Sequence, residues 1–323
     1  MTRIAVADIG GTHARFALAE VDGGNVVSLG EVVTLKTSEH ASLQTAWEDF
    51  GRTIAEPLPS AAALAIACPI QGEILKMTNN PWIIRPALVG EKLGVDTWIL
   101  VNDFEAVGHA VAQAGEEHFI HLCGPKVPLP ATGTISIIGP GTGLGVAHIL
   151  RDEKRYHVQP TEGGHIDFAP LDAIEDALLA SLRARYRRVS VERVVSGPAI
   201  VEIYEALAAL EGRAIQRLDD KTIWANGTSG EDSLAAAAID RFCLSLGSVA
   251  GDIALAQGGN AVVIAGGLGF RIKDILVRSG FAERFRAKGR FEAMMDSMPV
   301  KLITHPQPGL FGVAAAFARK HVA

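Results

Sequence analysis

Two glycine-rich loops carry the residues of this chain that are best suited to hold a polyphosphate. Residues 8–12 read Asp-Ile-Gly-Gly-Thr, residues 139–143 read Gly-Pro-Gly-Thr-Gly, and each loop lies between two short apolar runs. This pattern is typical of a β-hairpin with a glycine tip, which lets the backbone approach a bulky anion and aim its N–H groups at it. Two such hairpins could hold a nucleotide triphosphate tail between two lobes, which indicates phosphoryl-transfer chemistry.

Two better-known phosphate loops are excluded. A P-loop requires glycine-lysine and then Ser or Thr after four intervening residues, and the chain has no such run. Residues 139–145 look like a dinucleotide loop, but Leu144 occupies the position of the third glycine and a strand-like segment follows. Either hairpin alone could be an ordinary tight turn. The two hairpins together, with a third glycine turn after the apolar run 261–265, indicate a phosphate site more specifically than either hairpin alone.

The loops give a predicted set of nucleotide contacts. The set consists of Asp8, Gly10, Gly11, Thr12, Gly141, Thr142, Gly143, Gly266 and Gly267. Asp8 can hold Mg²⁺ through its waters, because magnesium is usually bound in this way beside substrate phosphates. The hydroxyls of Thr12 and Thr142 can contact phosphate oxygens. The predicted cofactors are therefore ATP and Mg²⁺.

A second set of polar residues fits a neutral, hydroxyl-rich ligand such as a sugar. Asn102 and Asp103 follow the β-rich run 97–101, and a helical stretch begins at Phe104. Asp103, ionised at neutral pH on its reference pKa, can orient a hydroxyl toward a γ-phosphate and accept its proton late. Alternatively, Asp103 caps the helix, although a cap alone does not explain the neighbouring Asn.

Residues 162–165 read Glu-Gly-Gly-His and place a carboxylate and an imidazole around two glycines. The glycines let both side chains face one ligand; the alternative is a simple turn with a surface Glu and a buried His. A metal site is less favoured, because no Cys or second His has suitable spacing here, and the sequence offers His118 and His121 no further ligand with metal-site spacing.

The elements that must position these residues repeat along the chain. Residues 3–8, 15–20 and 26–35 read as three consecutive strands, and residues 134–138, 146–150 and 155–159 read as three more. Strands are also expected at 61–67, 97–101 and 261–265. Helices are expected at 42–50, 104–114, 173–187, 198–210 with Ser196 as cap, 233–256 and 310–320. Each half thus opens with a meander and continues as α/β. The predicted domains are 1–112 plus 306–323 (small) and 113–305 (large).

Composition narrows the class of protein. The chain has 323 residues, 48% of them hydrophobic and 20% charged, which predicts an ordered globular protein. A net charge of −6 argues against general nucleic-acid binding, and the arginines near 183–188 are explained by solvent and a helix end. Three distant cysteines fit free thiols, and neither a secretory pattern nor a membrane-length apolar run is present. We expect a cytoplasmic protein without a membrane partner. The apolar helix 233–256 should be buried, and a homodimer is expected.

Taken in order, the motifs resemble those of the bacterial glucokinase family of the proteobacterial type, within the superfamily of actin, sugar kinases and heat-shock chaperone ATPases. The motifs span nearly the whole chain: residues 8–12, 66–70, 77–80, 102–104, 139–146, 162–170, 192–198 and 264–267. The resemblance implies a two-lobed actin-like (ribonuclease H-like) α/β fold, with mixed sheets flanked by helices and a ligand cleft between the lobes. It also implies ATP-dependent phosphorylation of glucose on its 6-hydroxyl.

The resemblance assigns further roles residue by residue. The family positions that match Asn102, Asp103, Glu162, His165 and Glu192 contact glucose, and the one that matches Asp103 is the base; Asn79 is an additional candidate. The role of Glu192 rests on the resemblance only. Two residues depart from the family, namely His13, where Asn is usual, and Pro140, which has no N–H for a phosphate. The rival interpretations are a kinase for mannose or fructose, a non-catalytic sugar sensor, and an actin-like filament protein.

Overall fold

The computed structural model describes residues 1–54, 56–77, 80–153 and 155–322. Its contacts divide the chain into two units, which are described separately. Unit 1 contains Met1–Gly115, Val158–Pro160 and His305–Ala323, and unit 2 contains Glu116–His157 and Thr161–Thr304. The sequence placed domain boundaries at 112/113 and 305/306. That the two units are independent domains stays a prediction.

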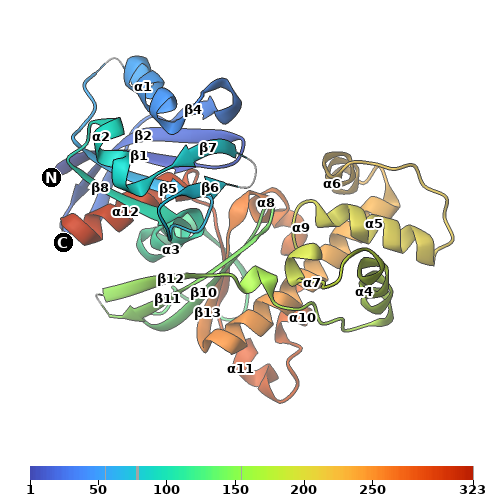
Figure 1. Ribbon diagram of the computed structural model, residues 1–323. Helices are drawn as coiled ribbons and strands as arrows, with labels where there is room; N and C mark the ends of the chain where they lie inside the picture. The colour runs from blue at the N-terminus through green and yellow to red at the C-terminus, as the bar shows by residue number, and fades with distance from the viewer. Residues whose placement is uncertain (55, 78–79, 154, 323) are drawn as a thin grey trace. The chain divides into compact units, whose positions relative to one another are not determined.

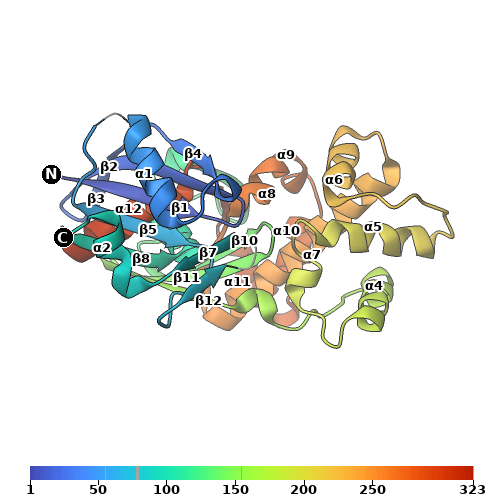
Figure 2. The same ribbon diagram turned by 45° about the horizontal axis from the view of Figure 1, so that its top comes forward.

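Unit 1 is built on a six-stranded mixed sheet (Figures 1 and 2). The strand order is β3-β2-β1-β5-β8, with β4 also on β2. β1, β2 and β3 pair antiparallel, whereas β1, β5 and β8 pair parallel. The strands are β1 (Thr2–Ile9), β2 (His13–Asp22), β3 (Asn25–Leu29), β4 (Val33–Lys36), β5 (Ala61–Ile66) and β8 (Thr97–Asn102), and a separate hairpin is formed by β6 (Leu75–Met77) and β7 (Asn80–Ile84).

Helices cover both faces of this sheet, because alternate residues of its central strands are apolar on either side. Ala5 and Ala7 of β1 belong to a core with α1 (Leu43–Ile54) and α2 (Val89–Leu93). Ile4 and Val6 belong to a second core with α3 (Asp103–Gln113) and α12 (Pro308–His321).

Unit 2 repeats this strand order. Its sheet runs β12-β11-β10-β13-β14-β9, in which β10 and β11 are antiparallel and β10, β13 and β14 are parallel. The strands are β9 (Phe119–Cys123), β10 (Thr132–Pro140), β11 (Leu144–Asp152), β12 (Arg155–Thr161), β13 (Gly259–Ile264) and β14 (Val300–Ile303). In both units an antiparallel meander is therefore followed by two parallel strands, as the sequence pattern predicted.

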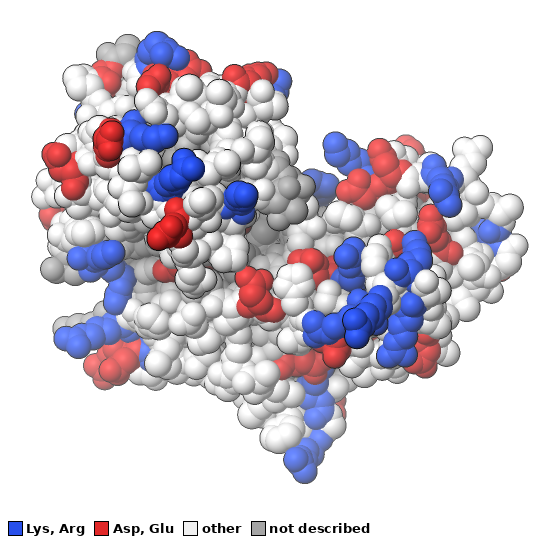
Figure 3. Space-filling model, in the orientation of Figure 1, with Lys and Arg blue, Asp and Glu red and all other residues white. Residues whose placement is uncertain are grey.

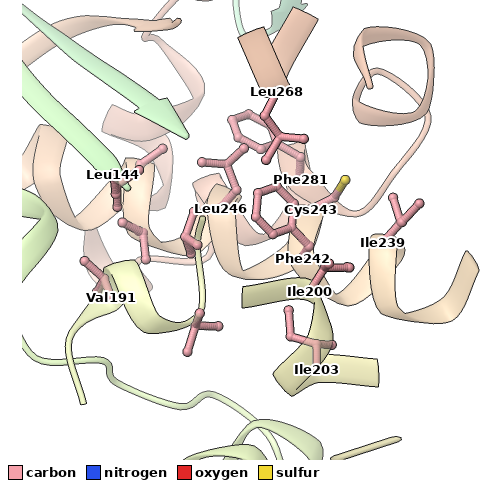
Figure 4. Packing of buried hydrophobic residues seen from close by; sticks show 14 of the residues in the cluster. Leu144, Val191, Ile200, Ile203, Ile239, Phe242, Cys243, Leu246, Leu268 and Phe281 are labelled. Carbon is pink, nitrogen blue, oxygen red and sulfur yellow. The ribbon is translucent and has the colours of Figure 1, made fainter. Parts of the chain in front are cut away.

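The helices of unit 2 enclose one large apolar core (Figure 4). Phe242, Cys243 and Leu246 of α7 meet Leu268 and Phe281 there. The helices are α4 (Ala173–Arg185), α5 (Ala199–Leu210), α6 (Asp220–Ser229), α7 (Ser233–Gln257), α8 (Gly266–Arg271), α9 (Lys273–Leu276), α10 (Phe281–Arg286) and α11 (Glu292–Asp296). Among the described residues, α7 alone is long and apolar enough to cross a membrane, but 72% of that stretch is buried in the protein. It is a core helix.

Two local expectations were wrong. The stretch 26–35 forms two strands, β3 and β4, because the chain leaves the sheet at Gly30, whose N–H donates to the Leu18 carbonyl (2.8 Å). Ser196 does not cap α5, whose N-cap is Pro198 without a side-chain hydrogen bond. The three cysteines are free, and Cys68 and Cys243 are buried, as expected.

Candidate active site

The first glycine loop joins β1 to β2, and its backbone leaves two N–H groups available. The Gly10 N–H donates to the His13 carbonyl at 3.0 Å, which closes the turn. No residue in the described part of the chain accepts from the N–H groups of Gly11 and Thr12. Free, adjacent N–H groups at a glycine turn are suited to an anion.

Two residues that the sequence analysis missed hold this loop in place. Thr37 donates its Oγ1 hydrogen to the Gly11 carbonyl (2.8 Å) and its N–H to the Thr12 carbonyl (3.0 Å). Asn80 is almost fully buried and donates from Nδ2 to the Gly10 carbonyl (3.0 Å). Asn80 belongs to the quoted motif 77–80 and could have been found there, whereas no local pattern marks Thr37.

Asp8 lies on β1 beside this loop. Arg15 Nη1 is 3.4 Å from its Oδ2, and burial raises the pKa of the carboxyl while Arg15 lowers it. The carboxylate therefore has incomplete counter-charge from the protein. Such a carboxylate is suited to reach, through water, a magnesium ion held by phosphates.

Asn102 ends β8, in register with Ile66 of β5, which in turn pairs with Ile9 of β1. The carboxyl ends of these parallel strands thus bring Asn102 and Asp103 to the edge that carries Asp8. Asn102 is the N-cap of α3: its Oδ1 accepts from the N–H groups of Phe104 (2.9 Å) and Glu105 (3.3 Å). The helix cap is therefore Asn102, and the sequence analysis was wrong to consider only Asp103 for it.

Asp103 begins α3, and its Oδ1 accepts from the Phe104 N–H at 2.9 Å. Burial, and then the negative charge of Asp8, raise the pKa of Asp103 to about 6. Since that value lies below 7, the carboxyl is still mainly ionised at neutral pH. A base whose pKa lies near the working pH accepts a proton more readily than one with a pKa near 4.

The second glycine loop joins β10 to β11 in unit 2 and resembles the first. The Gly141 N–H donates to the Gly143 carbonyl at 2.8 Å, and the Gly141 carbonyl accepts from the Gly197 N–H at 2.7 Å. Pro140 has no N–H. Within the described residues, the N–H groups of Thr142 and Gly143 have no acceptor. Each loop therefore presents two adjacent N–H groups and one exposed threonine.

Glu192 lies directly against this second loop. It belongs to a short 3₁₀ turn, Val191–Arg193, and its Oε2 accepts from the Leu144 N–H at 2.9 Å. A Cβ at Gly143 would lie 2.5 Å from the same oxygen, so only glycine allows this approach. The structure therefore gives Glu192 a contact with the loop backbone that its spacing in the sequence did not indicate.

Glu162 and His165 are brought together by another 3₁₀ turn, Gly163–His165. His165 Nε2 lies 3.9 Å from Glu162 Oε2, and the side chains are 55% and 77% exposed, so the alternative of a buried His is wrong. The turn packs on β11, where a side chain at Gly164 would overlap the Leu144 carbonyl oxygen. Leu144 is thus contacted at its N–H by Glu192 and at its carbonyl by Gly164 of the Glu162–His165 turn.

Gly266 and Gly267 begin α8 after β13. Gly266 has φ +85°, which favours glycine, and a Cβ there would lie 2.7 Å from the Pro140 carbonyl oxygen. The structure therefore brings the predicted site residues into two groups. Unit 1 holds Asp8, Gly10, Gly11, Thr12, Asn102 and Asp103, and unit 2 holds Gly141, Thr142, Gly143, Glu162, His165, Glu192, Gly266 and Gly267. Asn79 lies outside the described residues.

Two arginines of the cluster near α4, and Arg193 beside them, have partners within the protein. Figure 3 shows Lys and Arg side chains gathered over this region of the surface. Arg185 pairs with Glu202, Arg188 Nε lies 2.6 Å from Asp167 Oδ1, and the Arg193 guanidinium stacks 4.1 Å above the ring centre of Tyr186. Neighbouring acids and an aromatic ring account for these contacts.

Solved structures define the class of protein to which this fold belongs. The crystal structure of a glucokinase from an Antarctic psychrotroph matches with a TM-score of 0.86 and 33% identity, covering 98% of both chains. A glucokinase from Balamuthia mandrillaris, solved in complex with glucose, has the same fold with a TM-score of 0.75 at 21% identity, over 98% of this chain and 94% of that one. The chain has the actin-like, two-lobed α/β fold of the sugar kinases.

The sequence comparisons then specify the family. The family model described as Glucokinase matches residues 5–320. A glucokinase from Zymomonas mobilis is 61% identical over 318 residues, which is 98% of each chain, and one from Caulobacter vibrioides is 40% identical over 315 residues, 96% of this chain and 94% of the other. The chain belongs to the glucokinase family and is an ATP-dependent hexose kinase.

Proposed function

We propose that this protein transfers the γ-phosphoryl group of ATP to the 6-hydroxyl of glucose, with Asp103 as the base. The observation that carries the proposal is the position of Asp103, which directly follows the parallel strand β8 at the sheet edge that carries Asp8 and has a pKa raised to about 6. Family membership supports the reaction class.

In the proposed reaction, Asp103 orients the sugar hydroxyl and accepts its proton while the hydroxyl oxygen bonds to the γ-phosphorus. The bond between that phosphorus and the ADP oxygen breaks, and ADP leaves. A sugar hydroxyl is a weak nucleophile, so most of the rate gain is expected from positioning, with base catalysis contributing about 10²–10⁴-fold.

Five side chains are proposed to hold the sugar: Asn102, Asp103, Glu162, His165 and Glu192. Carboxylates, an amide and an imidazole suit a ligand that offers only hydroxyl groups. Asn102 already uses its Oδ1 in capping and donates from Nδ2 to the Cys68 carbonyl (3.2 Å), so its second Nδ2 hydrogen remains for a sugar oxygen.

The phosphates are proposed to contact the free N–H groups at Gly11, Thr12, Thr142 and Gly143, with the two threonine hydroxyls beside them. Gly266 and Gly267 are proposed to contact the rest of the nucleotide. Magnesium, reached through water by Asp8, would neutralise charge on the phosphates when bound.

The proposal also covers the oligomeric state, the location, the partners and the pathway of the protein. We propose a homodimer that acts in the cytoplasm on glucose and ATP, without nucleic acid or membrane partners, and whose product would enter glycolysis. The free cysteines support the cytoplasmic location, and the net charge of −6 supports the absence of general nucleic-acid binding.

The test is a coupled assay of sugar phosphate formation with ATP-Mg²⁺ and separate hexoses. We expect glucose to give the highest kcat/KM, with mannose and fructose well below it. Absence of glucose phosphorylation in a correctly folded preparation would contradict the proposal. A higher kcat/KM for mannose or fructose would mean that the protein is a kinase for that hexose.

A further inference from the structure

The carboxylate of Asp8 lies against the first turn of the C-terminal helix, α12. This helix begins at Pro308, and a Cβ at Gly309 would lie 2.6 Å from Asp8 Oδ2, 2.7 Å from its Cγ and 3.2 Å from Oδ1. The carboxylate therefore occupies the space that any other residue at position 309 would fill with its side chain. The helix dipole favours a negative charge at this end.

The same helix is fixed to the element that carries Asp103. α12 packs along α3, where a side chain at Gly312 would overlap the Ala106 carbonyl oxygen. Asp103 is the first residue of α3. One helix thus contacts Asp8 through one glycine and the backbone of α3 through another, one turn later.

From this geometry we propose that Gly309 is a positioning residue that sets where the Asp8 carboxylate stands relative to Asp103. The proposal rests on the proposed function, in which Asp8 reaches the magnesium of the nucleotide and Asp103 accepts the sugar proton. Gly309 acts through Asp8 and is not itself expected to touch a substrate.

Gly309→Ala is a suitable probe because the colliding atoms are the end of a side chain. Asp8 can move aside, whereas the collision at Gly312 is with backbone and would separate two helices. The variant should therefore fold with its carboxylate displaced. Val313→Ala is the matched control, since Val313 is fully buried on the same helix and its truncation destabilises the core without adding atoms beside Asp8.

Three measurements are compared in the wild type, Gly309→Ala and Val313→Ala. They are the dependence of kcat on Mg²⁺, glucose binding by tryptophan fluorescence without metal or nucleotide, and the rise in melting temperature caused by ADP with and without Mg²⁺. For Gly309→Ala we expect kcat to fall about 10- to 100-fold, the usual effect of a small misplacement. The extra melting-temperature rise that Mg²⁺ adds to ADP should be lost, and the glucose Kd should stay within about twofold of the wild type. Val313→Ala should melt earlier but keep the Mg²⁺ response.

A double-mutant cycle with Asp8→Ala covers the case in which Gly309→Ala is less stable than expected. If the collision with Asp8 lowers the melting temperature of Gly309→Ala, that loss should disappear when the substitution is made in the Asp8→Ala variant. A wild-type Mg²⁺ response of Gly309→Ala, weakened glucose binding, or an undiminished cost in the Asp8→Ala background would overturn the inference. Failure of the wild type to phosphorylate glucose would instead overturn the proposed function, because the ADP melting measurement does not depend on it.

Discussion

Asp103 combines partial burial with a negative charge, and this combination costs stability. A carboxyl whose pKa is about 6 in the folded state and about 3.8, its ordinary value, in the unfolded state binds more protons when folded than when unfolded between those two pH values. Its contribution to the free energy of unfolding therefore falls as pH rises from about 4 to about 6 and stays reduced at pH 7.

Asp103→Asn should accordingly separate stability from turnover. We expect kcat to fall about 10²–10⁴-fold, because the base is lost, while glucose binding is retained. Unfolding of the ligand-free protein in urea should become harder by about 1–3 kcal/mol, because a partly buried charge is removed. Asp96→Asn, an exposed acid just before β8, should change neither quantity. Normal turnover in Asp103→Asn would remove Asp103 from the proposed role.

The same pKa predicts the pH dependence of the reaction. The ionised form is the active one, so kcat/KM should be constant above pH 7 and fall on the acidic side with an apparent pKa near 6. The measurement is kcat/KM for glucose between pH 5 and 8 at constant ionic strength. An acidic limb near pH 4 would indicate that Asp103 has its ordinary pKa.

Glu192 is proposed to bind the sugar, and it also accepts the Leu144 N–H at the second glycine loop. Glu192→Gln keeps an acceptor oxygen for that N–H but loses the charge, so the KM for glucose should rise roughly 10- to 100-fold with little change in the KM for ATP. Glu192→Ala removes both contacts and should raise both KM values. If Glu192→Gln and Glu192→Ala changed the KM for ATP equally, Glu192 would have no role in holding the loop.

At the scale of elements, α4 is held by a buried ionic network that the sequence did not reveal. Glu175 is almost completely buried and accepts from the Leu171 N–H (2.7 Å) and Ser245 Oγ (3.1 Å). Its carboxylate lies within 4 Å of Arg241 and Arg284. The segment that follows the Glu162–His165 turn is thereby anchored to α7 and α10.

Glu175→Ala should destabilise the protein by about 3–5 kcal/mol, because it removes one acceptor from two largely buried guanidinium groups and the acceptor of the Leu171 N–H. Glu39→Ala is the matched control, since its pair with Lys36 is exposed and should contribute under about 1 kcal/mol. Urea unfolding of both variants measures the difference. Arg241 and Arg284 also pair with Asp172, so similar losses of stability for the two variants would mean that Asp172 alone is sufficient for these arginines.

The regular elements were predictable because apolar periodicity and glycine turns are local signals. The meanders, α7 and α12 follow from them. Contacts between distant segments were not predictable, and these contacts position the residues of the candidate site. Glu192 reaches Leu144 across 48 residues, and Thr37 reaches Gly11 across 26. At the start of α3 the sequence analysis considered Asp103 for the cap and not Asn102, because both residue types cap helices well.

At the scale of the whole molecule, each unit has its own apolar core. Phe242 is fully buried in unit 2, and Phe16 is fully buried in unit 1. The cores are composed of residues from one unit each, which supports the prediction that the units are separate domains.

Phe242→Ala should therefore accelerate hydrogen exchange in unit 2 and leave unit 1 near the wild-type rate, and Phe16→Ala should do the reverse. Each truncation should cost about 3–5 kcal/mol in its own unit. Exchange measured by mass spectrometry on both variants checks this. Uniform acceleration through the whole chain would mean that the two units unfold as one cooperative body.

The strand order shared by the two units has a kinetic consequence. The β1–β2 and β10–β11 hairpins join segments that are neighbours in the chain, whereas β5, β8, β13 and β14 add to them only after long crossovers. Because chain closure over short separations loses less entropy, both hairpins should assemble early during folding. The turn between β1 and β2 would then form before the pairing of β8 with β5 brings Asn102 and Asp103 to the same edge of the sheet.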